Sequence, residues 1–330
     1  MKKTVFNGKI ALLCVVFFLY AGLSAFAQVT PPGLGDLQKS MDEFSGNLAK
    51  SLPFNASMGL NWSEAHIKKF PHFGAGASLG FTTMESGAFG ELLDQFGFSL
   101  PVDLGGFPVP GYAIEGRMGG FFLPFDVGFK FGLMPMKPNG IKNWDYFLIG
   151  GDIRYAVVQE NMILPMVSVG LGFNYLSGAL GMSAGSDRSF DFVNPNGNTP
   201  ASMTLKAPDL TVNWSTATID MKAQISKTFI LLTPYFGVGA SNGWSKAGYN
   251  VETTITTTGA TSDEAKEAAK KLGIDLNNAG FSSSETFTGW SFRMYGGFSF
   301  NLMILRIDLT GLFNFVDQNY GVSLGFRVQM

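Results

Sequence analysis

Residues 123–134 read Leu-Pro-Phe-Asp-Val-Gly-Phe-Lys-Phe-Gly-Leu-Met. The odd positions are all apolar through Leu133, and the even positions are mostly glycine, proline or a charged residue. Successive side chains of a β-strand point to opposite faces. A period of two therefore predicts a strand with one apolar face and one small or polar face.

The same alternation recurs along most of the chain. It predicts ten strands, at residues 73–83, 111–120, 123–134, 146–158, 163–176, 210–226, 229–243, 284–300, 302–316 and 319–329. Residues 54–63 and 98–104 would raise the number to twelve, although Pro101 weakens the second of these candidates. In either case the strand number is even, which places both ends of the barrel domain, residues 54–330, on one side of a membrane.

The polar face of these segments distinguishes a barrel from a soluble β-sandwich. A water-facing sheet usually carries long charged side chains, whereas this face is rich in glycine and serine. A transmembrane barrel turns its apolar face to lipid and places aromatic residues at both interfaces. Four tryptophans fall near the ends of alternating segments and are the interfacial candidates, namely Trp62, Trp144, Trp214 and Trp244. The prediction is an all-β, antiparallel transmembrane barrel of ten to twelve strands.

Short and long connections alternate between the segments. The long ones span residues 135–145, 177–209 and 244–284, and this pattern is typical of outer-membrane barrels with long outer loops. We expect the second long loop to be irregular, because it is rich in Gly, Ser, Asn and Pro. In the third, Thr253 to Thr258 could prolong a hairpin, and residues 263–272 could form a short helix.

The N-terminus carries export features. Residues 1–27 combine basic residues, an apolar run at residues 10–19 and Ala25-Phe26-Ala27, which is typical of a cleaved signal peptide. We therefore expect export to the bacterial outer membrane. Cys14, the only cysteine, lies in this peptide, so the mature chain would have no thiol.

A helical segment should precede the barrel. Within residues 28–53, Leu34 to Leu52 has apolar residues at spacings of three and four, which predicts an amphipathic helix. This short N-terminal helical segment could hang in the periplasm or plug the barrel.

Composition narrows the classes of partner. Only 15% of residues are charged, while Gly (42) and Phe (32) are abundant, which excludes a disordered chain. The net charge of −2 indicates no nucleic-acid partner.

Charged residues on the polar face are predicted to point into the barrel. These lumen-lining candidates are Glu115, Arg117, Asp126, Lys130, Asp152, Arg154, Asp220, Lys222, Arg293, Arg306, Asp308 and Arg327, five acids and seven bases. Two interpretations remain open: a selectivity lining that meets a solute, or ion pairs that fill a narrow lumen.

Two histidines are the candidates for metal binding or catalysis. His66 and His72 lie on one polar connection with Lys68 and Lys69, and no carboxylate or cysteine cluster accompanies them. We therefore interpret residues 64–72 as a hydrated turn. Neither a catalytic residue, a metal site nor a cofactor is predicted, and an enzyme is not expected.

The last strand, Tyr320-Gly-Val-Ser-Leu-Gly-Phe-Arg-Val-Gln-Met330, resembles the assembly signal of bacterial outer-membrane β-barrels, with Met330 where an aromatic is usual. Residues 61–64 and 71–81 are similar to uncharacterised spirochaete-type outer-membrane proteins. A weaker resemblance, carried by the N-terminal segment, is to outer-membrane long-chain fatty-acid channels. These resemblances imply the lipid bilayer and the outer-membrane assembly machinery as partners.

Two functional hypotheses follow. The first is a channel or transporter for small or hydrophobic solutes. The second is a closed barrel that presents its long loops, residues 177–209 and 244–284, for adhesion, ligand binding or structural anchoring.

Overall fold

The computed structural model describes residues 34–67, 72–85, 87, 106–120, 123–133, 141–183, 187–193, 199–252, 254–259, 261, 264 and 280–330. The predicted signal peptide, the candidate strand at residues 98–104 and nearly all of the expected helix at residues 263–272 lie outside the described residues.

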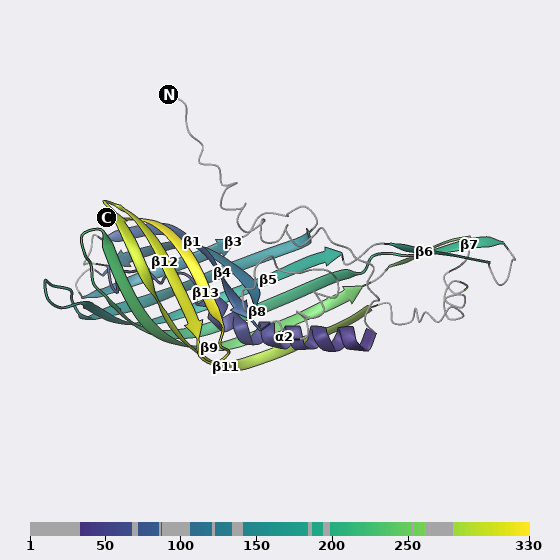
Figure 1. Ribbon diagram of the computed structural model, residues 1–330, viewed down its shortest axis with the longest axis horizontal. Coiled ribbons are helices and arrows are strands. Elements are labelled where there is room, and N and C mark those ends of the chain that lie inside the picture. Colours follow the sequence, from purple (N-terminus) through teal and green to yellow (C-terminus); the bar gives the residue numbers. More distant parts are fainter. Residues whose placement is uncertain are drawn as a thin grey trace, which may run out of the picture.

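Ten strands close an antiparallel barrel (Figure 1). In chain order they are β1 Phe73–Met84, β2 Phe107–Gly119, β3 Phe125–Leu133, β4 Ile141–Val158, β5 Met166–Ser183, β8 Asp209–Ser226, β9 Leu232–Glu252, β11 Gly280–Leu302, β12 Leu305–Asn314 and β13 Tyr320–Gln329. The first and last strands close the barrel, from Gly74 opposite Gln329 to Thr82 opposite Gly321. The predicted fold class is confirmed, and each of the ten predicted segments corresponds to one strand. Residues 54–63 form no strand.

The two ends of the barrel differ. At the short-turn end, brief connections join β2 to β3, β4 to β5, β8 to β9 and β11 to β12. The first and last strands also meet there, where the Met330 N–H donates to the Phe73 carbonyl. The opposite, long-loop end carries the longer connections, together with the brief β12–β13 link.

Several strands are longer than a bilayer requires. β4, β5 and β8 have 18 residues each, β9 has 21 and β11 has 23. A tilted strand crosses a bilayer in about 9–11 residues. The surplus of β8, β9 and β11 forms an extended wall beyond the barrel, comprising residues 209–216, 245–252 and 280–287.

A separate three-stranded sheet lies at the long-loop end. It comprises β6 Arg188–Val193, β7 Pro200–Leu205 and β10 Ile255–Thr258, in the order β10-β7-β6, and Figure 1 shows β6 and β7 projecting away from the barrel. The expectation of an irregular loop at residues 177–209 was therefore wrong. β5 continues to Ser183, and the β6–β7 pairing supplies regular backbone hydrogen bonds despite the turn-forming composition. The threonine-rich stretch contributes β10.

One ion pair supports the base of this sheet. Lys206 Nζ donates to Asp187 Oδ2 at 2.7 Å, and the Ala207 N–H donates to Oδ1. The hydrogen bond from Lys206, followed by that from Ala207, lowers the pKa of the Asp187 carboxyl. The carboxylate therefore holds the two ends of the β6–β7 hairpin together.

The predicted amphipathic helix is α2, Leu34–Ala56. It contacts β8, β9 and β11 at the long-loop end, and Figure 1 shows it beside β9 and β11. Its apolar stripe includes Met41, Phe44 and Leu48, which are buried in one cluster with Trp144 and Tyr249. The helix therefore covers the inner face of the extended wall and does not hang from the short-turn end. Within the described residues, no helix is long and apolar enough to cross a membrane.

A closed barrel has no free strand edge, so the folded chain should resist detergent. We expect an unboiled sample to migrate differently from a boiled one on a detergent gel, because the continuous ladder must break before the chain binds detergent uniformly. A chain ending at Asp317 lacks β13 and is the control, since its barrel cannot close. Identical migration of the full chain before and after boiling would contradict a stable barrel.

Candidate functional site

The barrel wall separates apolar from charged residues. On the outer face, Phe129, Leu171 and Phe236 are each about half exposed. Of the twelve charged candidates, eleven are buried inside the barrel, and Arg306 is partly buried. The interior is the candidate functional site because it concentrates these charges.

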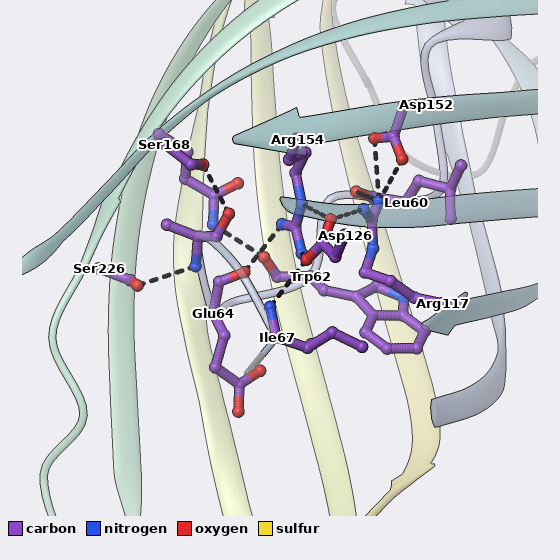
Figure 2. Close-up of polar contacts among 12 residues, drawn as sticks. Leu60, Trp62, Glu64, Ile67, Arg117, Asp126, Asp152, Arg154, Ser168 and Ser226 are labelled. Carbon is purple, nitrogen blue, oxygen red and sulfur yellow. Dashed lines mark hydrogen bonds and ion pairs between the residues drawn. The ribbon is translucent and has the colours of Figure 1, made fainter. Parts of the chain in front are cut away.

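Asp126 is the centre of the first ion-pair group. Arg117 Nη1 donates to its Oδ1 at 2.5 Å, and Arg154 donates to both oxygens, at 2.9 Å from Nε and 2.6 Å from Nη2. The two guanidinium groups approach the one carboxylate from neighbouring strands, as Figure 2 shows. Arg117 also binds Asp152, which in turn pairs with Lys222 at 2.5 Å. The group thus joins β2, β3, β4 and β8.

Two further ion pairs lie on the remaining wall. Arg293 donates to both oxygens of Asp220, each at 2.8 Å, and Ser241 donates to the same carboxylate. On the last strands, Arg327 Nε donates to Asp308 at 2.7 Å. Buried charges are tolerated only when paired and hydrogen-bonded, and these groups meet that condition.

After α2 the chain runs inside the barrel. This lumen segment, residues 57–67, is buried throughout. It turns at Gly59 and Leu60, which both have positive φ, 81° and 57°. At Gly59 a side chain would meet Glu115 Oε1 at 2.9 Å from its Cβ, so glycine suits both the backbone conformation and the space.

Cations of the wall bind the backbone of this part of the chain. Lys130 Nζ donates to the carbonyls of Ala56 and Met58 at 2.7 and 2.5 Å. Arg117 and Lys222 both donate to the Leu60 carbonyl, at 3.4 and 3.1 Å. The wall charges therefore bind the lumen segment as well as one another.

The carboxyl-terminal part of the lumen segment is bound in the same way. Arg154 donates to the Glu64 carbonyl at 2.8 Å, and the Ile67 N–H donates to Asp126 at 2.7 Å. Ser168 and Ser226 bind the Ala65 carbonyl and N–H, respectively, as Figure 2 shows. Hydrogen bonds to four wall strands, β3, β4, β5 and β8, thus fix this part of the segment.

Trp62 was predicted to be interfacial, but it lies within the lumen. It is 4% exposed, and its Nε1 donates to Glu115 at 2.6 Å. The guanidinium groups of Arg117 and Arg327 lie over its ring, 5.8 and 4.6 Å from the centroid. Because residues 54–63 are not a strand of the wall, Trp62 has no route to the lipid-facing surface.

The other predicted interfacial tryptophans differ from one another. Trp144 is 8% exposed and Trp214 is partly buried, and both pack with α2 in the apolar cluster of the long-loop end. Their interfacial assignment is therefore wrong for a physical reason: both rings lie near the long-loop ends of their strands and pack in the apolar cluster that α2 forms there. Trp244 is 48% exposed, and its interfacial position stays a prediction.

Glu64 is the charged residue that sequence reasoning missed. Arg327 donates to its Oε2 at 2.6 Å, and Arg306 lies 3.5 Å from Oε1. The twelve predicted residues comprise five acids and seven bases, so Glu64 raises the acids to six against seven. The surplus of bases was the signal that an acid from elsewhere in the chain completes the set.

The hydrated-turn interpretation of residues 64–72 was wrong for residues 64–67, which are buried. Among them, His66 lies in the lumen. His72 is outside the lumen, with Nδ1 2.8 Å from the Met330 carbonyl, and Lys68 and Lys69 lie outside the described residues. No group of three or more His, Cys, Asp and Glu residues that could hold a metal occurs in the described part of the chain.

Little space remains beside the lumen segment. A cavity of about 20 Å³ lies between Trp62, Glu115, Asp308 and Arg327, which is room for about one water molecule. In the described residues, the lumen is therefore filled by the chain itself, which binds most of the charged groups of the wall, although a few buried polar atoms, such as His66 Nε2 and Arg293 Nε, have no hydrogen-bond partner.

Comparisons with known proteins give only weak likenesses. No protein-family model matches the chain, and no curated protein matches it. The transport unit of the autotransporter AIDA-I from Escherichia coli is 8% identical, covering 86% of this chain and 97% of that chain, with a TM-score of 0.22. The CymD monoaromatic hydrocarbon channel is 10% identical, covering 92% and 97%, with a TM-score of 0.22.

A Pseudomonas aeruginosa FadL homologue is 9% identical, covering 78% of this chain and 88% of that chain, also with a TM-score of 0.22. At these TM-scores the likenesses carry no argument about function.

Removing one partner of the buried network should be costly. We expect Arg154→Met to lower the free energy of unfolding by about 3–5 kcal/mol, because Asp126 and the Glu64 carbonyl lose their donors inside the lumen. Urea unfolding of the refolded protein in detergent micelles, followed by tryptophan fluorescence, measures this change.

The matched control is Lys142→Met, which breaks an exposed ion pair with Asp209. It should change the unfolding midpoint little, because water and salt screen such pairs. Equal effects of the two substitutions would contradict a structural role for the interior network.

Proposed function

We propose that the protein is an integral bacterial outer-membrane barrel that is sealed at rest by its own N-terminal segment. The apolar outer face and the charged interior support insertion in a bilayer. The export features of residues 1–27 support delivery to the outer membrane. The lipid bilayer and the outer-membrane assembly machinery are accordingly the proposed partners, the latter through the last strand.

The proposed role of this sealed barrel is to anchor and present a surface at the long-loop end for binding or adhesion. The observation that carries the proposal is the filled lumen, in which the backbone of residues 56–67 forms hydrogen bonds with the charged side chains of the wall. The long strands support it as well, because β8, β9 and β11 continue past the length that a bilayer needs. The chain thus has more ordered structure outside the belt than sealing a membrane requires.

The orientation follows from the connections. Outer-membrane barrels keep short turns in the periplasm and long loops outside. The short-turn end would therefore face the periplasm, and the extended wall, α2 and the three-stranded sheet would face the exterior.

A second candidate function is a gated channel or transporter for small or hydrophobic solutes. It is favoured by the nature of the seal, since a single chain segment closes the lumen and could leave it without breaking a strand pair. In this alternative, the wall charges would line the open path. The absence of enzymatic activity stays a prediction.

Conductance separates the sealed state from an open pore. We expect the intact protein to give no conductance steps in planar bilayers, because the lumen segment fills the path. Deleting residues 34–67 should produce steps that favour anions, since five acids and seven bases then line the interior. Steady conductance of the intact protein would contradict the seal, and a silent deletion variant that retains heat-modifiable migration would contradict the channel alternative.

Surface labelling tests the orientation. Ser189→Cys places a thiol on the exposed β6 strand, in a chain whose other cysteine, Cys14, belongs to the predicted signal peptide. We expect a membrane-impermeant maleimide to label this variant on intact cells. Labelling only after the outer membrane is permeabilised would contradict an outward-facing long-loop end.

A further inference from the structure

The hairpin tips at the short-turn end are unusually apolar. Met162 in the β4–β5 turn is 97% exposed, Ile230 in the β8–β9 turn 95% and Met303 in the β11–β12 turn 92%. Further large apolar residues of the same turns are also exposed, namely Ile163, Leu164, Phe229, Leu231 and Ile304, and so is Leu123 in the β2–β3 turn. A turn in water has no reason to present such residues, and exposed apolar patches usually mark a contact with a partner or a membrane.

The polar atoms of the β4–β5 tip bind one another. Asn161 Oδ1 accepts hydrogen bonds from the N–H groups of Ile163 and Leu164, at 2.9 and 2.8 Å. Lys227, from the next turn, donates to the carbonyls of Asn161, Met162 and Leu164. The ammonium group of Lys227 is thus bound to the backbone carbonyls of this tip.

Polar groups of the neighbouring tips also form hydrogen bonds within the protein. The Thr228 N–H donates to Glu160 at 2.7 Å, and Phe229 and Leu232 exchange backbone hydrogen bonds. In the β11–β12 turn, Arg306 donates to the Met303 carbonyl at 3.0 Å. Backbone in a lipid environment must find its hydrogen-bond partners within the protein, and these hydrogen bonds satisfy part of that requirement.

The height of the apolar belt places the turns at its edge. On β12 and its following link, outward-facing residues run from Leu305, which is 37% exposed, to Phe315, which is 53% exposed. They are ten positions apart, which at a tilt of 45° corresponds to a height of about 24 Å, and the apolar band of such barrels is about 25 Å tall. The belt therefore begins where the turn ends, without an intervening polar collar.

The distribution of the tips identifies the kind of partner. The four turns connect β2 to β3, β4 to β5, β8 to β9 and β11 to β12, which follow one another around the barrel. A single protein partner would need one patch on one side, whereas a ring of apolar tips that continues the lipid-facing belt fits a lipid layer.

We propose that these hairpin tips insert into the adjacent lipid leaflet, so that the partner of the short-turn end is lipid and this end has no water-exposed collar. The inference rests on the proposed function, because it requires the barrel to lie in a bilayer. It adds that the tips at Met162, Ile230 and Met303 anchor the barrel at a fixed depth. The long-loop end, with its exposed ion pairs, carries the water-facing structure of the described chain.

Single-cysteine labelling tests this placement in the full chain without Cys14. Ile230→Cys and Met303→Cys, each carrying an environment-sensitive fluorophore, are reconstituted in phosphatidylcholine vesicles. Quenching is then compared for lipids that carry a nitroxide near the headgroup and for iodide in the water. Val238→Cys, on the outer face of β9, is the lipid-facing control, and Ser189→Cys is the water-facing control.

Both tip variants should be quenched by the nitroxide lipid, and iodide should quench them about threefold less than the Ser189→Cys variant, as for residues seated at the headgroup boundary. Iodide quenching equal to that of Ser189→Cys, without lipid quenching, would overturn the inference. So would protection that appears only at high protein concentration, which would indicate a second copy of the chain. Val238→Cys lies about six residues from the start of β9 and is tested with a lipid that carries the nitroxide deep in its acyl chain; if it escapes that quencher, the membrane barrel itself fails.

Discussion

The carboxylate of Asp126 and its four hydrogen bonds connect the interior. Arg117 and Arg154 bind it from the wall, and the Ile67 N–H binds it from the lumen segment. Charges removed from water must be paired, because the cost of desolvation otherwise exceeds any gain. The predicted wall residues alone hold more bases than acids, so the barrel requires oxygen atoms from elsewhere in the chain. Glu64 and the carbonyls of residues 56–64 supply them.

This requirement links the wall, the seal and the exterior structure. The lumen segment can reach its partners only if the chain enters the barrel at the long-loop end, and α2 fixes that entry by packing Phe44 and Leu48 under the extended wall. The surplus length of β9 and β11 provides the surface on which the helix lies. A sealed lumen and a long exterior wall are thus two parts of one arrangement.

The sequence predicted the strands well because one face meets an apolar environment and the other does not, which preserves the period of two. The same pattern was misleading at Phe54, Met58 and Trp62, where alternating apolar residues resembled a strand. These side chains are buried because the barrel encloses the segment on all sides. The spacing of apolar residues cannot show that a segment lies inside a barrel. The position of Glu64 was missed for a related reason, since its partners Arg306 and Arg327 are distant in the sequence. The β6–β7 hairpin was missed because a composition rich in turn-forming residues predicted an irregular loop, although the two short strands pair locally.

The most direct measurement of the filled lumen is a cross-link between the segment and the wall. The Ala65 N–H lies 2.9 Å from Ser226 Oγ, so cysteines at these two positions, in a chain without Cys14, should be joined by an oxidant or a short bifunctional reagent. A filled lumen predicts an internal cross-link in the folded protein, found by mass spectrometry, and none between Ala65→Cys and Ser189→Cys. Two free thiols in a folded Ala65→Cys/Ser226→Cys barrel would contradict it.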